Sequence, residues 1–96
     1  MSSNKLSMAS TVCRSEDQLS TEMGGETVLM SIAQGSYFNL DSIGTDIWQR
    51  LEQPVSVSDL CAQLGREYDA DAGTIARDVL ALLNQLAAKG LIEVRA

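Results

Sequence analysis

The 96-residue chain is long enough for one small domain with a single core, and too short to add a deep enzyme cleft. Its hydrophobic content of 45% is normal for a globular domain and excludes wholesale disorder. The formal charge of −6, without any run of basic residues, argues against a nucleic-acid binder, because such proteins attract phosphate through Lys and Arg.

The N-terminus differs in composition from the rest of the chain. Residues 1–10 are mostly small or polar, and we predict a flexible tail there, followed by a folded domain over residues 11–96. The tail lacks the apolar stretch of a secretory signal, and nothing later approaches the roughly 20 apolar residues of a membrane span. Two isolated cysteines, Cys13 and Cys61, fit reduced thiols buried as small hydrophobic residues. Together these features predict a cytoplasmic protein.

Ser, Asp and Glu are abundant in the sequence, but two features on which many enzymes depend are missing. The sequence contains no His, which removes the usual general base at neutral pH and a common metal ligand. It also has no Gly-rich phosphate loop. We therefore expect a binding domain that is not an enzyme, with no metal and no cofactor.

Short strands are predicted in the first half of the chain. Period-two alternation of apolar residues marks four β-rich segments: 11–14, 19–23, 27–33 and 36–40. Gly24-Gly25 and Gln34-Gly35 are typical turn sequences between them. In the last segment, alternation places Phe38 and Leu40 on one face. The pattern predicts a small antiparallel meander.

Three helices are predicted in the second half. Asp41 is a candidate N-cap for the first helix, which Pro54 ends. Ser56 begins a capping-box pattern for the second helix. Asp71 is the candidate cap of the third, which runs over 72–89 and ends at Gly90. The apolar run after Gly90 predicts either a short final strand or a packed tail.

The third helix carries more apolar surface than one core face requires. Its two adjacent stripes are Ile75, Val79, Leu82 and Leu86, and Ala76, Leu80, Leu83 and Ala87. A helix with one face exposed to solvent needs only a single apolar stripe, about 100° wide around the helix axis. We therefore expect this helix to be buried on two sides or to leave an apolar strip for a partner.

Strands followed by helices, without alternation, indicate an α+β domain. The predicted architecture is winged helix-turn-helix-like, with a three-stranded antiparallel sheet followed by three helices. A winged-helix DNA-binding protein is therefore one alternative function, although the third helix offers only Arg77 and Lys89 for phosphate contacts. A second alternative is a carrier protein with phosphopantetheine on Ser42, because residues 41–43 resemble the D-S-L motif of such carriers.

Two stretches resemble PqqD-like proteins. Residues 35–48, GSYFNLDSIGTDIW, match the pattern G-x-Y-Y-x-L-N-x-x-G-x-x-I-W, and residues 67–92 match Y-x-V-D followed by D-V-x-x-F-L-x-x-L-x-x-x-G-L-I. The resemblance covers about residues 11–94. Asp41, Ala70 and Leu82 depart from the common Asn, Val and Phe without removing a group that the family needs.

The resemblance implies a RiPP recognition element, which binds the leader segment of a ribosomal precursor peptide. In such proteins the leader adds as a strand to the third strand and packs beside the third helix. The residues expected to bind peptide here are Ser36, Tyr37, Phe38 and Asn39 on the strand edge, and Ala76, Leu80, Leu83, Asn84 and Ala87 on the second stripe. The free-standing form is most similar to the lasso-peptide type, whose partners are a cysteine-protease leader peptidase and an ATP-dependent cyclase. An open sheet edge can equally pair with a second copy, so a homodimer is also expected to be accessible.

Overall fold

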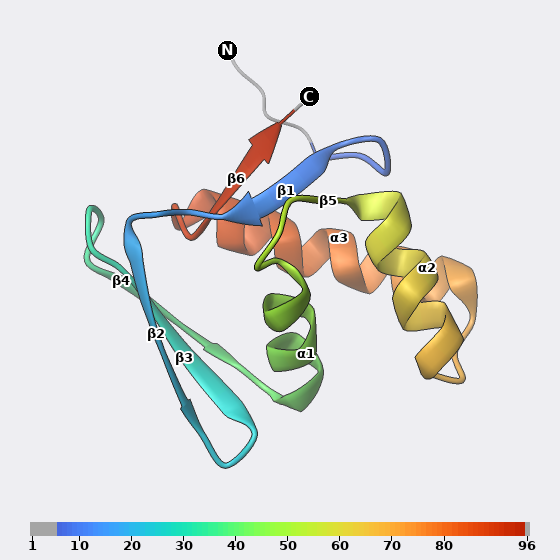
Figure 1. Cartoon of the computed structure of the whole chain (residues 1–96), viewed down its shortest axis with the longest axis horizontal. Helices are drawn as coiled ribbons and strands as arrows, with labels where there is room; N and C mark the ends of the chain where they lie inside the picture. The colour runs from blue at the N-terminus through green and yellow to red at the C-terminus, as the bar shows by residue number, and fades with distance from the viewer. Residues whose placement is uncertain (1–5, 96) are drawn as a thin grey trace.

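The structure, a computed structural model, describes residues 6–95 (Figure 1). In chain order the elements are β1 (Thr11–Arg14), β2 (Gln18–Met23), β3 (Glu26–Ser31), β4 (Ser36–Leu40), α1 (Ser42–Arg50), β5 (Val55–Ser56), α2 (Val57–Glu67), α3 (Ala72–Ala88) and β6 (Ile92–Arg95). The α+β class is confirmed, as is the three-stranded antiparallel sheet followed by three helices in the described residues. A second small sheet, which the sequence pattern did not predict, completes the fold.

The first sheet has the order β2-β3-β4 and is the predicted meander. Gly24 and Gly25 have φ of 62° and 85°, as a two-residue hairpin turn of the primed type requires, and this turn pairs Met23 with Glu26. The hairpin projects away from the helices (Figure 1). Because β4 follows β3 in the sheet and no other strand within residues 6–95 pairs with its far side, it is an edge strand.

The second sheet has the order β5-β1-β6 and corrects the expectation that 11–14 belongs to the meander. Val12 lies opposite both Val55 and Val94, and its side chain is fully buried. A two-residue strand such as β5 is too short for apolar alternation to reveal, so local sequence could not show the partners of β1. The apolar run after Gly90 forms strand β6, so the expected short strand is confirmed over the packed tail.

The described part of the predicted tail, residues 6–10, is packed against the domain. Leu6 is 9% exposed and belongs to the hydrophobic core, and the Ser10 carbonyl accepts a hydrogen bond from the Val57 N–H at 2.9 Å. The loose tail expected for this segment is therefore corrected at residues 6–10. Residues 1–5 of that prediction lie outside the described residues.

The predicted helix caps are confirmed. The side chains of Asp41, Ser56 and Asp71 accept first-turn backbone N–H groups at 2.8, 3.0 and 3.0 Å. Gly90, with φ of 74°, follows the end of α3 in the left-handed conformation that favours glycine. Local side-chain chemistry thus sets the helix boundaries closely.

Side-chain contacts hold α1 against both sheets. The hydroxyls of Thr27 on β3 and Thr45 on α1 form a buried hydrogen bond of 2.9 Å. The Arg14 guanidinium lies 4.7 Å from the ring centre of Trp48 and donates to the Trp48 carbonyl at 2.9 Å. Since α1 follows β4 directly, these contacts also determine where the β4 edge lies.

Both cysteine thiols are free, with Cys13 buried and Cys61 partly buried against the core. Burial raises the pKa of the Cys61 thiol above its ordinary value of 9.0. Over residues 6–95, none of the helices has the length and apolar character needed to cross a membrane.

Candidate functional site: a groove between β4 and α3

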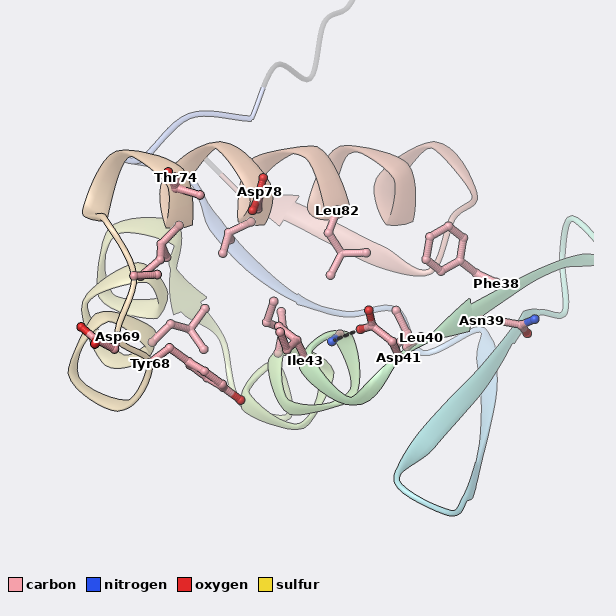
Figure 2. A pocket seen from close by; sticks show the side chains of 16 residues that line it. Phe38, Asn39, Leu40, Asp41, Ile43, Tyr68, Asp69, Thr74, Asp78 and Leu82 are labelled. Atoms are coloured by element: carbon pink, nitrogen blue, oxygen red, sulfur yellow. Dashed lines mark hydrogen bonds between the residues drawn. The ribbon is translucent and has the colours of Figure 1, made fainter.

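A groove of about 630 Å³ opens between the end of β4, the first turns of α1 and one flank of α3 (Figure 2). β4 contributes Phe38, Asn39 and Leu40. α3 contributes Thr74, Ile75, Asp78, Val79 and Leu82. The far end of the groove is formed by residues 68–70, where α2 connects to α3. The groove therefore runs alongside an edge strand.

The free edge of β4 gives the groove a set of backbone hydrogen-bonding groups. In an antiparallel sheet, alternate residues of an edge strand direct both N–H and C=O away from their partner strand. β3 pairs with β4 over its whole length, from Ser31 opposite Ser36 to Thr27 opposite Leu40. The outward-directed groups of β4 remain for an added strand, and an extended peptide is a ligand that can satisfy donors and acceptors together.

The groove also presents apolar surface. Ile43, on the first turn of α1, is 51% exposed although it belongs to the groove lining. Phe38 and Leu82 are partly buried against the core and border the same space (Figure 2). An apolar cleft beside a few polar groups is typical of a binding site, since covering such side chains is favourable.

A polar network holds Tyr68 at one end of the groove. The Tyr68 hydroxyl donates to an Asp46 carboxylate oxygen at 2.7 Å, and Arg50 bridges Asp46 at 3.0 Å and Glu67 at 2.7 Å. Burial raises the pKa of the Asp46 carboxyl, but the hydrogen bonds from Arg50 and Tyr68 outweigh this effect and hold the pKa below its ordinary value of 3.8. The bond to Asp46 also raises the pKa of Tyr68 above 10.0. The network fixes the ring where α1 and α2 meet.

Of the four strand residues expected to bind peptide, the structure brings two to the groove. Phe38 and Asn39 line it. Ser36 and Tyr37 precede them on β4, and the Tyr37 side chain, 66% exposed, lies on the sheet face opposite to Phe38. The edge itself nevertheless includes all four residues.

The expected residues on α3 lie elsewhere. None of Ala76, Leu80, Leu83, Asn84 and Ala87 lines the groove. Leu83 is 0% exposed and belongs to the core, and Asn84 is exposed. At 3.6 residues per turn, Leu82 and Leu80 lie on opposite flanks of the buried stripe, and the Leu82 flank faces β4. Peptide binding by the Leu80 flank stays a prediction.

Sequence reasoning missed Ile43, Tyr68 and Leu82 as groove residues. Leu82 belongs to the first of the two apolar stripes on this helix, together with residues of the core. Ile43 and Tyr68 fall within the two stretches that resemble PqqD-like proteins, which was the signal that could have found them. Among residues 6–95, no group of three His, Cys, Asp or Glu side chains is arranged to hold a metal ion.

Comparison with known proteins finds a match that includes both stretches noted in the sequence, residues 35–48 and 67–92. The family described as coenzyme PQQ synthesis protein D (PqqD) matches residues 26–92, more than half of the chain. The chain belongs to the PqqD family. Among solved structures, this PqqD family member is similar to TbiB1 in complex with the TbiA(beta) leader peptide, with 33% identity over 84% of this chain and 94% of that chain, and a TM-score of 0.77. Among curated proteins no significant sequence match is found. The resemblance to PqqD-like proteins is confirmed.

Proposed function

We propose that this PqqD family member is a non-catalytic cytoplasmic adaptor that binds the leader segment of a ribosomally synthesised precursor peptide. The observation that carries the proposal is the free edge of β4 beside an apolar groove, in a chain 33% identical to a protein solved with a leader peptide. The sequence resemblance to the free-standing lasso-peptide type leads us to propose a lasso-peptide pathway. There the adaptor would present its cargo to a leader peptidase of the cysteine-protease type and to an ATP-dependent cyclase.

The proposed binding mode combines strand addition with side-chain burial. The leader pairs with the backbone of β4, and alternate side chains enter the groove beside Ile43 and Leu82. Burying two or three apolar side chains contributes roughly 1.5–3 kcal/mol each. Ordering a disordered segment costs about 2–5 kcal/mol. The balance is a moderate affinity, which suits a carrier that releases its cargo to enzymes.

The proposal is tested by selecting linear peptides from a random-sequence library displayed on mRNA, with the purified protein as bait. We expect enriched peptides that bind as extended strands and slow hydrogen exchange of β4 amides. Purified protein incubated with a selected peptide should leave its mass unchanged, as expected of a non-catalytic adaptor. Cleavage or modification of the peptide would contradict that part of the proposal.

Proline substitutions at Tyr37, Phe38 and Asn39 supply the control for strand addition. Proline removes one N–H, and because outward-directed groups alternate, the set includes at least one residue whose amide points away from β3. Variants that keep the wild-type melting temperature are compared by fluorescence anisotropy with labelled selected peptides. Unchanged affinity throughout the folded members of this set would refute strand addition at β4.

A matched pair on α3 decides which flank forms the groove wall. Leu82→Ser changes a residue that lines the groove, whereas Leu80→Ser changes a partly buried leucine on the other flank. Both substitutions remove similar packing, so their melting temperatures should fall by similar amounts. Only Leu82→Ser should also weaken peptide binding in the folded state. Selective loss with Leu80→Ser would place the peptide on the Leu80 flank instead.

A further inference from the structure

The charged residues that line the groove are all acidic. They are Asp41 at the start of α1, Asp69 in the connection from α2 to α3, and Asp78 on α3 (Figure 2). Among residues 6–95, no Lys or Arg belongs to the lining. Acidic residues also outnumber basic residues 13 to 7 in the whole chain. A peptide that approaches the groove therefore meets a negative potential over an apolar surface.

Two of these carboxylates are available to a ligand. Asp41 is occupied as the N-cap of α1, because its Oδ1 accepts the Gly44 N–H at 2.8 Å. Asp69 and Asp78 are exposed, and the ion pairs within residues 6–95 are formed by other carboxylates. The two aspartates come from different elements and lie along the rim of one groove.

We infer that the groove selects a leader segment in which Lys or Arg accompanies the apolar side chains that fill it. This inference rests on the proposed leader-binding function. The long apolar stem of a Lys or Arg can lie along Leu82 while its charged end reaches Asp78. At the other end of the groove, such a stem can lie along Tyr68 while its charged end reaches Asp69. An acidic side chain at the same place would meet like charge and be rejected. The apolar wall supplies affinity and the acidic rim supplies selectivity.

The expected size of the effect follows from the exposure of the rim. Exposed ion pairs of this kind contribute roughly two- to fivefold in affinity each. The attraction is screened as ionic strength rises, with a Debye length of about 10 Å at 0.1 M salt and about 3 Å at 1 M. Neutralising both aspartates should thus weaken a basic peptide several-fold at low salt and much less at 1 M salt.

The test repeats the random-peptide selection on three baits: the wild-type chain, Asp69→Asn/Asp78→Asn, and the matched control Glu16→Gln/Asp17→Asn. Both double variants change the formal charge from −6 to −4, but Glu16 and Asp17 are exposed before β2 and do not line the groove. We expect Lys and Arg to be enriched with the wild-type and control baits. The groove variant should lose that enrichment while it keeps the apolar positions of the selected peptides.

The outcomes separate this inference from the function on which it rests. The inference would be overturned if the groove variant enriched Lys and Arg as strongly as the wild type does. It would also be overturned if the control variant lost this enrichment to the same extent as the groove variant, because Asp69 and Asp78 would then have no specific effect. Peptides that need the β4 edge but show no basic preference would refute the inference alone. Peptides whose binding is indifferent to the folded proline variants of β4 would refute the proposed function itself.

Discussion

Ile43→Ala probes the groove with little cost to the fold. The side chain is 51% exposed on the first turn of α1 and lines the groove. Alanine also has the higher helix propensity, which offsets part of the lost packing. A bound peptide should cover the exposed half of the isoleucine, so the substitution should act on binding more than on stability.

The magnitude follows from the area that remains exposed in the free domain. Full burial of the three carbons removed is worth about 0.8 kcal/mol each. Since Ile43 is 51% exposed, a peptide can cover about half of that surface, which gives about 1.2 kcal/mol. A loss of this size corresponds to roughly eightfold weaker binding.

Ile32→Ala is the matched control, because Ile32 is 55% exposed in the connection from β3 to β4 and does not line the groove. Labelled peptides from the selection are titrated by fluorescence anisotropy, and unfolding is followed by the fluorescence of the single tryptophan. We expect weaker binding for Ile43→Ala and wild-type affinity for Ile32→Ala. Equal affinities of the two variants would show that the peptide does not cover the groove at α1, and the reasoning would be refuted.

Two further predictions concern the contacts that hold the groove in shape. Thr45→Val leaves the buried Thr27 hydroxyl without its partner, so urea denaturation should show a free energy of unfolding that is lower by about 1–3 kcal/mol. The double variant Thr27→Val/Thr45→Val should recover part of this loss. No recovery in the double variant would contradict this explanation. Tyr68→Phe should lower the melting temperature near neutral pH by removing the bond to Asp46. Because the pKa of Asp46 is lowered in the folded state, its contribution to folding stability is present above pH 3.8 and is lost as the pH falls through the lower folded value. The difference in melting temperature between Tyr68→Phe and wild type should therefore narrow below pH 3.8. A difference that stays constant with pH would contradict the network.

The sequence by itself determined the local structure. Asp41, Ser56 and Asp71 cap helices where predicted, because a cap depends on one side chain and the N–H groups of the next turn. Gly24-Gly25 forms the hairpin turn for a similarly local reason, since both residues adopt positive φ. The motif in residues 35–48 also indicated the family, and with it the β4 edge as the place to look for a ligand.

Only the tertiary structure decided which surfaces meet. Leu80 and Leu82 are both leucines on an apolar helix, and helical spacing shows that they lie on different flanks but not which flank faces β4. That choice is made by the packing of α3 against α2 and β6, which sets how α3 is turned relative to β4. Similarly, β1 pairs with β5 and β6, two strands that lie far from it in the sequence. Such contacts depend on the burial of surfaces distant in sequence, and periodicity within one segment carries no information about them.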